Sequence, residues 1–197
     1  GREAFKSCFA LESIVIPEGI TRIESETFIY CNKLANVTLS SNLEEIGSGA
    51  FFDCAITNIL IPQSVTSIDM SAFSGASKLE RIDVEANNSV YASIDGVLFS
   101  KDYISLLRYP CAKSGDYTIP NNVTTIVDRA FSNCSKLSGI TIPSNVTRIN
   151  TGAFFRCFAL KNIVIPASIT SIEKETFKDC NNISSITIPQ SVVKIDA

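Results

Sequence analysis

The sequence predicts a predominantly β fold with little helix, in which the short strands of successive repeats stack into a solenoid with a parallel sheet. Two observations predict it: an apolar pattern that returns about every 23 residues, and a β-branched Ile-x-Ile strand signal followed by proline within each repeat. Repeats of this length bury their apolar faces only against their neighbours, so we expect one elongated domain over residues 1–197.

Phenylalanines mark the repeats at intervals of 23, 23, 22, 58, 23 and 23 residues, and six of the seven are followed three residues later by cysteine. Because each occupies one fixed repeat position, we assign them to the repeat core: Phe5, Phe28, Phe51, Phe73, Phe131, Phe154 and Phe177, with Cys8, Cys31, Cys54, Cys134, Cys157 and Cys180. Ala76 takes the cysteine position after Phe73, which indicates that the position requires a small buried residue.

Each repeat is expected to contribute a strand, a turn and a second short strand. In residues 140–143, Ile-Thr-Ile-Pro, alternate β-branched residues point inward, and the proline ends the strand because it lacks the N–H that would extend the ladder. The later pair Val146 and Ile149 returns the chain on the opposite face, and the Ala-Phe step fills the corner before the next repeat.

The interval from Phe73 to Phe131 holds an irregular insertion, placed at about residues 87–116. Asp95-Gly96 and Lys101-Asp102 fall at strand-like intervals and indicate tight turns, so a β-hairpin excursion is expected here. The repeat pattern resumes at residues 117–120, Tyr-Thr-Ile-Pro. A variant repeat packed on the array is favoured over a dedicated ligand site, although insertions in repeat arrays often lie on the binding face.

The pattern AFxxCxxLxxIxIPxxVxxI, read from Ala130 to Ile149, resembles the consensus of the BspA-like (Treponema pallidum-type) leucine-rich repeat family, and the likeness covers nearly the whole chain. The resemblance implies a right-handed leucine-rich-repeat solenoid. It also implies a secreted or cell-surface protein that takes part in adhesion to host proteins and other cells, without catalytic residues. The chain starts and stops inside a repeat, so we expect it to be a fragment of a longer protein.

Composition argues against several partners. The net charge is −3, and the 17 basic residues are scattered singly, so no basic stripe for nucleic acid is present. No apolar run approaches the roughly 18 residues of a membrane span, and we expect no membrane contact by this fragment.

The cysteines are not predicted to bind metal, because zinc needs converging ligands while a ladder spreads its thiols along a line, and the chain has no histidine. Disulfides between neighbouring repeats are disfavoured because stacked Cβ vectors run parallel. Cys111 lies outside the ladder; it is either exposed, paired or buried, and burial is favoured.

No enzyme activity and no cofactor are predicted. Without histidine the usual general base is missing, and no nucleophile elbow, phosphate loop or metalloprotease motif occurs. The SxxK match at residues 191–194 falls inside the repeat pattern and is interpreted as a coincidence.

Surface residues remain as the candidates for function. The outward strand positions form two short, mostly polar columns: Ser13, Asn36, Asn58, Arg81, Asp116, Gly139, Asn162 and Ser185, and Val15, Thr38, Leu60, Asp83, Thr118, Thr141, Val164 and Thr187. Arg81 and Asp83 are the oppositely charged pair in these columns, and aromatic and arginine side chains of the insertion are enriched types at interfaces. The candidate partner-binding residues are therefore Arg81, Asp83, Tyr91, Tyr103, Arg108 and Tyr109.

Our first hypothesis is a non-catalytic protein-binding domain whose partner is a host matrix or cell-surface protein. A second is a structural stalk or self-association domain without its own ligand. A third is glycan binding at the insertion through exposed tyrosines, which burial of Tyr91, Tyr103 and Tyr109 would contradict.

Overall fold

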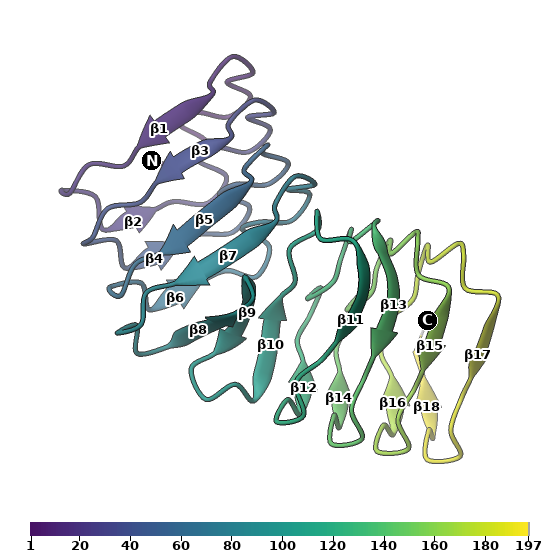
Figure 1. The fold of residues 1–197 in the computed structure, drawn as a ribbon. Coiled ribbons are helices and arrows are strands. Elements are labelled where there is room, and N and C mark those ends of the chain that lie inside the picture. The colour runs from purple at the N-terminus through teal and green to yellow at the C-terminus, as the bar shows by residue number, and fades with distance from the viewer. Residues whose placement is uncertain (197) are drawn as a thin grey trace. The chain divides into compact units, whose positions relative to one another are not determined.

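The computed structural model describes residues 1–196, and these contain strands and turns but no helix (Figure 1). The chain divides into two compact units, Gly1–Lys101 (unit 1) and Asp102–Ala197 (unit 2). Each unit is a stack of coils, one coil per repeat, which confirms the predicted β-solenoid. The two units are described separately, and the organisation of residues 1–197 as a single domain stays a prediction.

Unit 1 carries two sets of parallel strands and a hairpin. The strands are β1 (Ser13–Val15), β2 (Arg22–Ile23), β3 (Asn36–Thr38), β4 (Glu45–Ile46), β5 (Asn58–Ile61), β6 (Ser67–Ile68), β7 (Arg81–Val84), β8 (Tyr91–Ile94) and β9 (Val97–Ser100). The Ile-x-Ile strands pair as β1–β3 and β5–β7, and the short return strands pair as β2–β4–β6. Both expected strands of each repeat are therefore present.

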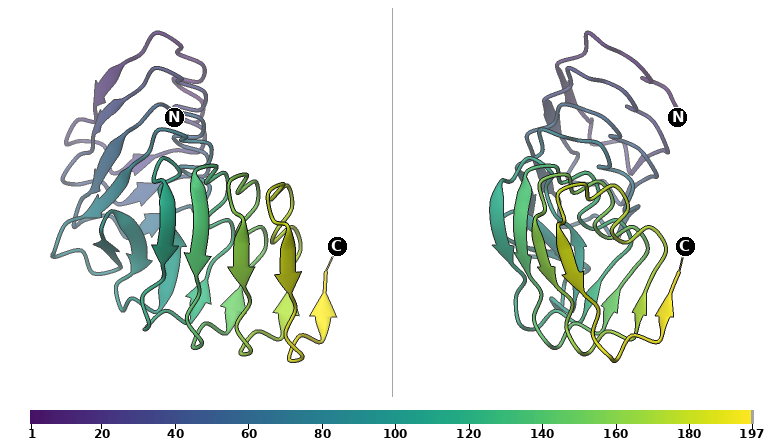
Figure 2. Two further views of the ribbon diagram at one scale, coloured as in Figure 1. Left: turned by 45° about the vertical axis from the view of Figure 1, so that its right-hand side comes forward. Right: turned by 90° about the vertical axis from the view of Figure 1, so that its right-hand side faces the viewer.

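Unit 2 repeats this arrangement, and Figure 2 shows its two rows of parallel arrows from two sides. The strands are β10 (Ser105–Arg108), β11 (Gly115–Thr118), β12 (Thr125–Ile126), β13 (Leu137–Thr141), β14 (Arg148–Ile149), β15 (Asn162–Val164), β16 (Ser171–Ile172), β17 (Ser185–Thr187) and β18 (Lys194–Ile195). One row has the order β11–β13–β15–β17, and the other contains β10–β12–β14 and β16–β18.

The corner of each coil is sharper than the sequence suggested. The residues two positions before and two positions after the core phenylalanine take positive φ, as at Glu26 (59°) and Tyr30 (63°) around Phe28, except that Ser71 before Phe73 does not. This geometry turns alternate N–H groups of the corner toward the next coil, where Phe28 N donates to Ala50 O at 2.9 Å. The corner is thus a third hydrogen-bonded ladder, which satisfies backbone groups that a buried loop would leave unpaired.

The core contains the predicted phenylalanine column. Phe28, Phe51, Phe131 and Phe154 are buried, and consecutive rings in each unit stack at centroid distances of 5.0–5.7 Å. Phe5 is 41% exposed because it belongs to the first coil described and has a neighbour on one side. The cysteine column is buried from Cys31 onward, and its thiols are free.

The predicted hairpin is confirmed: β8 and β9 pair antiparallel with Ile94 opposite Val97. Its two turn residues, Asp95 and Gly96, both have positive φ (50° and 76°), as the tightest hairpin turns require. Ile82 N of β7 donates to Gly96 O at 2.8 Å, so the hairpin turn lies against β7.

The regular coils resume earlier than predicted. In β10, Ser105 and Leu106 pair in parallel with Thr125 and Ile126, so Leu106 takes the place of the consensus isoleucine. Three residues later, Tyr109 takes the phenylalanine position and stacks on Phe131 at 5.1 Å. The irregular segment is therefore shorter than residues 87–116, because a leucine and a tyrosine fill core positions that the consensus gives to isoleucine and phenylalanine.

Candidate binding surface

The outward columns run along the parallel sheets as the repeat alignment predicted. In unit 1, Ser13 pairs with Asn36 and Asn58 with Arg81, while in unit 2 Asn162 pairs with Ser185. Side chains one column apart point to the same face because strand positions alternate. The columns therefore present rows of side chains to solvent at strand spacing.

Large apolar side chains stand exposed in the second column. Val15 is 70% exposed, Leu60 52% and Val164 77%; Leu60 lies within β5, whereas Val15 and Val164 are the last residues of β1 and β15. Strand propensity explains a valine here, whereas leucine is not among the residues that strands favour. Leu60 is paired with Asp83, so this apolar side chain lies beside a charged one.

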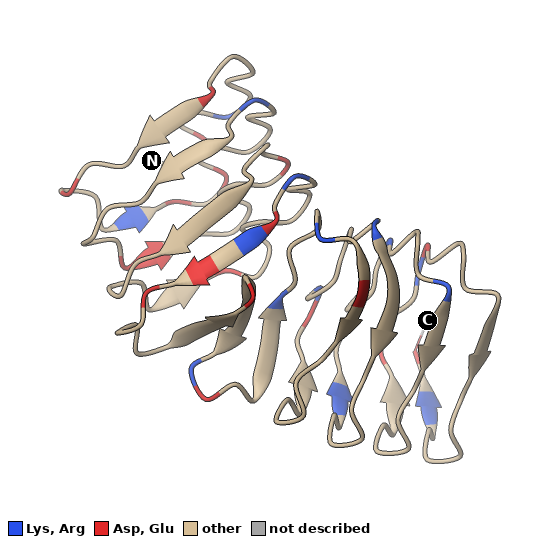
Figure 3. Cartoon of the chain, viewed as in Figure 1, with Lys and Arg blue, Asp and Glu red and all other residues tan. Residues whose placement is uncertain are grey.

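Arg81 and Asp83 form a two-pronged ion pair on β7, where Figure 3 shows a blue and a red segment on one strand. Arg81 Nε and Nη2 donate to the two Asp83 carboxylate oxygens at 3.0 and 2.8 Å. The hydrogen bonds that Arg81 donates to Asp83 raise the pKa of Arg81 above its usual range. Both side chains are exposed, so the pair contributes little to folding and remains open to a partner.

The hairpin holds the stem of Arg81 in place. A Cβ on Gly96 would lie 2.9 Å from the Cβ of Arg81, so no other residue fits without moving the β7 side chain. The predicted neighbourhood of the Arg81–Asp83 pair and the insertion is thus present within unit 1.

Three of the four insertion residues proposed for binding lie in the core instead. Tyr91 is 7% exposed, and its hydroxyl accepts a hydrogen bond from Ile68 N at 2.8 Å. Arg108 and Tyr109 are 1% and 2% exposed. The expectation that these side chains line a surface is wrong, because they replace consensus core residues or satisfy backbone groups of the neighbouring coil.

Tyr103 is the remaining member and is half-buried, with φ of 58°. Its carbonyl accepts a hydrogen bond from Asn122 Nδ2 at 3.0 Å, which ties the loop to the next coil of unit 2. With Tyr91 and Tyr109 buried, the insertion has no set of exposed tyrosines on which a sugar ring could stack.

The sheet of unit 2 has a polar hollow that the sequence did not predict. Residues Asp116, Ser138, Gly139, Lys161 and Asn162 line a shallow depression of about 430 Å³. Ser138 Oγ donates to Asp116 Oδ1 at 2.8 Å, and a Cβ at Gly139 would lie 2.7 Å from that same oxygen. Glycine in the outward column was the available signal: it lets the Asp116 carboxylate lie over the strand.

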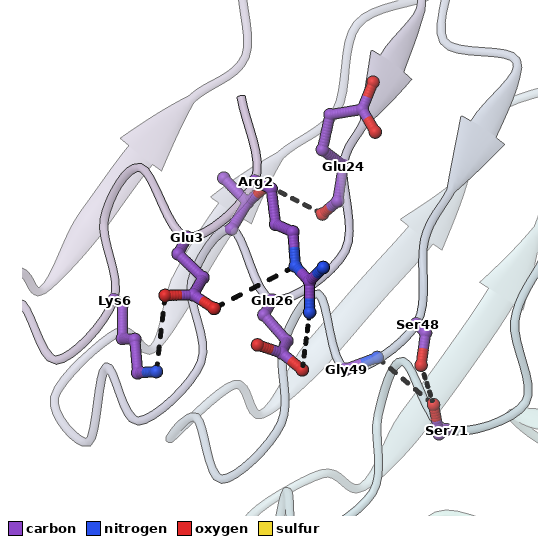
Figure 4. A network of polar contacts seen from close by, with 9 residues as sticks. Arg2, Glu3, Lys6, Glu24, Glu26, Ser48, Gly49 and Ser71 are labelled. Carbon is purple, nitrogen blue, oxygen red and sulfur yellow. Dashed lines mark hydrogen bonds and ion pairs between the residues drawn. The ribbon is translucent and has the colours of Figure 1, made fainter.

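The first coils carry a network of exposed charges, drawn in Figure 4. Lys6 pairs with Glu3 at 3.4 Å within the first coil, and Arg2 pairs with Glu26 of the next coil at 3.9 Å. Exposed pairs of this kind contribute at most about 1 kcal/mol each and are screened by salt. We interpret them as a solvated face of the solenoid.

Over residues 1–196, no group of three or more histidine, cysteine, aspartate or glutamate side chains is arranged to hold a metal ion. In the same range there is no helix with the length and hydropathy to cross a membrane.

The thiols of the cysteine column cap backbone carbonyls, a role that the sequence did not reveal. Cys54 Sγ donates to Phe28 O at 3.0 Å, and Cys31 Sγ donates to Phe5 O at the same distance. The acceptor is each time the core phenylalanine of the preceding coil. Cysteine is therefore both small enough for the column and able to donate a weak hydrogen bond that Ala76 cannot.

Burial makes this column sensitive to alkaline pH. Burial raises the pKa of the Cys54 thiol to about 12, and the neighbouring Cys31 adds a smaller increase. A thiol in the unfolded chain ionises near pH ~8.5. The folded state keeps a proton that the unfolded state loses. The contribution of Cys54 to the free energy of unfolding is therefore complete below its pKa in the unfolded chain. It falls by about 1.4 kcal/mol per pH unit as the pH rises toward its pKa in the folded protein.

This dependence can be measured against Cys54→Ala, which copies the alanine found at position 76. We expect urea midpoints to show a wild-type advantage over the variant at about pH 7.5 that shrinks by about pH 10.5. The variant removes the Cys54 thiol and leaves every other titrating group. A difference in midpoint between wild type and variant that stays constant with pH would therefore contradict the raised pKa of Cys54.

The repeat pattern, the coil geometry and the two outward columns can now be compared with known proteins. The family model of the BspA type leucine rich repeat region matches residues 1–115 and 105–197 in six copies. The chain belongs to the BspA-type leucine-rich repeat family. This confirms the resemblance inferred from the AFxxCxxLxxIxIP pattern. No curated protein matches the chain.

Solved bacterial structures share the fold of this BspA-type chain. A leucine rich cell surface protein of Faecalibacterium prausnitzii is 36% identical, with a TM-score of 0.88 over 98% of this chain and 52% of its own. The pneumococcal vaccine antigen PcpA is 30% identical, with a TM-score of 0.88 over 94% of this chain and 47% of its own. A leucine-rich repeat protein of Eubacterium ventriosum, 23% identical with a TM-score of 0.79 over 99% of this chain and 68% of its own, shows the fold alone.

The BspA-type chain thus spans about half the length of the first two of these structures. Of these neighbours, the Faecalibacterium protein is described as a cell-surface protein.

Proposed function

We propose that the chain is a non-catalytic protein-binding domain for adhesion, part of a secreted or cell-surface protein. Its contact surface lies on β5 and β7 of unit 1, where Leu60 stands beside the Arg81–Asp83 pair. The observation that carries the proposal is the 52% exposure of Leu60 at a central strand position.

The chemistry of this patch suits a protein partner. An exposed leucine supplies apolar area that loses water on binding, and Arg81 supplies a planar group able to hydrogen-bond a carboxylate or carbonyl. Arginine is one of the residue types enriched at interface hot spots, and Leu60 adds apolar area beside it. The surface description of the Faecalibacterium neighbour supports a location where such a partner is reached.

The test is retention on immobilised extracellular-matrix proteins and, separately, on immobilised glycans. We expect the wild-type chain to bind a matrix protein, and Leu60→Asp or Arg81→Glu to weaken binding about tenfold or more. Val164→Asp is the matched control, because Val164 is exposed at the same repeat position of unit 2.

Retention of the partner by all variants alike removes the β5–β7 patch from the site. A loss in Val164→Asp as large as in Leu60→Asp moves the contact away from unit 1. Failure of the wild-type chain to bind any protein in the panel favours the stalk or self-association role instead.

A further inference from the structure

One place in unit 2 breaks the regular cysteine column. Elsewhere each ladder thiol donates to the phenylalanine carbonyl of the preceding coil at 3.0–3.1 Å, as at Cys157 and Cys180. Cys134 departs from this pattern, because its hydrogen bond to the corresponding carbonyl, that of Tyr109, is longer, at 3.7 Å. Its Sγ also lies 3.6 Å from Cys111 Sγ.

The cause is an offset of one residue. In the regular repeat the cysteine follows the aromatic by three positions, whereas Cys111 follows Tyr109 by two. Cysteines at equivalent positions of stacked coils have parallel Cα–Cβ bonds, which keep their sulfurs apart. Cys111 is not at the equivalent position, so its Cα–Cβ bond need not run parallel to that of Cys134. The offset brings the sulfur of Cys111 within hydrogen-bond distance of the ladder thiol one coil away.

A buried cation lies against this thiol pair. Arg108 Nη2 is 3.3 Å from Cys111 Sγ, and the guanidinium is held by the carbonyls of Arg129 (2.8 Å) and Ser132 (3.3 Å). Arg108, Cys111 and Cys134 are 1%, 2% and 0% exposed. A positive charge in such a setting strongly favours a negative sulfur beside it.

The two thiols consequently differ in ionisation. The hydrogen bond from Cys134, together with Arg108, lowers the pKa of Cys111 to about 6 against the opposing effect of burial. Burial and the same hydrogen bond raise the pKa of Cys134. As a neutral thiol, Cys111 donates to Ser132 O at 3.3 Å. The opposite shifts make Cys111 the thiol of the pair that ionises first.

We propose that Cys111 and Cys134 form a redox modification site, in which a peroxide oxidises Cys111 and Cys134 then closes a disulfide between neighbouring coils. The geometry of the two sulfurs and of Arg108 carries this assignment, and it does not depend on the binding surface of unit 1.

The chemistry balances with hydrogen peroxide as the oxidant. The Cys111 sulfur attacks one peroxide oxygen, the O–O bond breaks, and hydroxide leaves, which gives a sulfenic acid at Cys111. The Cys134 sulfur then attacks the Cys111 sulfur and displaces the hydroxyl group, which leaves as water with the Cys134 proton. In sum, two thiols and one peroxide give one disulfide and two waters, and the sulfurs lose the two electrons that the peroxide gains.

Burial selects the oxidant and sets the rate. The two sulfurs are 3.6 Å apart and must approach to a bond length of about 2.05 Å, so one corner of the coil has to move slightly toward the other. Because both side chains are almost fully buried, we expect the oxidant to be hydrogen peroxide, which is little larger than water and enters with a small local opening of the coil. Glutathione disulfide is too bulky to do so without unfolding of the coil.

The experiment is peptide mapping of the folded chain after treatment with hydrogen peroxide and alkylation of the remaining thiols. Trypsin cuts after Arg108, Lys113, Arg129 and Lys136, so the two cysteines fall in separate short peptides, residues 109–113 and 130–136. We expect these peptides to be joined by a disulfide, and Cys111 to react at least about tenfold faster than the protonated thiol of Cys54.

Two isosteric variants separate the steps. Cys134→Ser removes the second thiol and should leave a sulfenic acid on Cys111, trapped by dimedone. Cys157→Ser alters the next ladder position, whose thiol has its regular carbonyl partner, and should form the 111–134 link like the wild type. Circular dichroism confirms that both are folded.

The proposal is overturned if wild type forms no 111–134 link, or if the link requires Cys157. Oxidation of Cys54 at the same rate as Cys111 also overturns it, because the site would then have no selectivity.

Discussion

Replacing Asn88 by alanine is expected to lower the free energy of unfolding of unit 1 by about 4 kcal/mol, at roughly 1 kcal/mol for each hydrogen bond lost. Asn88 is fully buried, and its Nδ2 donates to Pro62 O and Val65 O at 2.8 and 2.9 Å. Its Oδ1 accepts from Val90 N and Tyr91 N at 2.9 and 2.7 Å.

The size of the effect follows from the position of these groups. Asn88 ties the start of the hairpin to the turn between β5 and β6, which contains Pro62 and Val65. Alanine would leave two carbonyls and two N–H groups buried without this partner, and an unsatisfied buried group costs its full desolvation energy.

Urea denaturation followed by far-ultraviolet circular dichroism measures the change. Asn87→Ala is the control, because the neighbouring asparagine is exposed and its truncation should change stability by less than about 0.5 kcal/mol. Equal midpoints for the two variants would show that Asn88 does not anchor the hairpin.

Phe131→Ala is expected to destabilise unit 2 by about 3–5 kcal/mol. The ring is fully buried and stacks between Tyr109 at 5.1 Å and Phe154 at 5.0 Å. Truncation opens a cavity in the middle of the column and removes stacking on both sides. Because coils contact only their neighbours, the damage should interrupt cooperative unfolding within the unit.

The control for this variant is Phe158→Ala in the same unit. Phe158 is 41% exposed and lies one residue beyond the cysteine ladder, so its loss should cost less than about 1 kcal/mol. Denaturation of both variants under identical conditions gives the comparison. A cost for Phe158 equal to that for Phe131 would refute the role of the aromatic column.

The repeat itself was predictable because its signals recur. The Ile-x-Ile strand, the proline after it and the Phe-Cys spacing appear in nearly every coil. The interpretation of one repeat is therefore supported by the same pattern in the other repeats. The outward columns followed directly, and the strand registers bear out pairs such as Asn58 with Arg81 and Leu60 with Asp83.

The left-handed corner was not predictable from residue type. Glycine occupies its first positive-φ position at Gly49 and Gly152, but glutamate or arginine occupies the same position in other coils, as at Glu26 and Arg129. Backbone hydrogen bonds to the next coil hold the corner in this conformation. They compensate for the free energy that a non-glycine residue costs at positive φ.

The candidate site was predicted only in part. Arg81 and Asp83 lie on the surface beside the hairpin, as their strand positions required. Tyr91, Arg108 and Tyr109 were placed on the surface by residue type and lie in the core. Interface propensity describes which residues bind when exposed, and it does not determine whether they are exposed.

The sequence by itself determined the repeat length, the strand pairs of each coil, the core column and the hairpin turn at Asp95-Gly96. These depend on local preferences and on a period, both of which are visible in one chain. Only the tertiary structure decided that Leu106 and Tyr109 continue the core and that Cys111 meets Cys134 beside Arg108. The physical reason is that a residue in a non-consensus coil takes its environment from the coil stacked on it, and a shift of one position changes which atoms it meets.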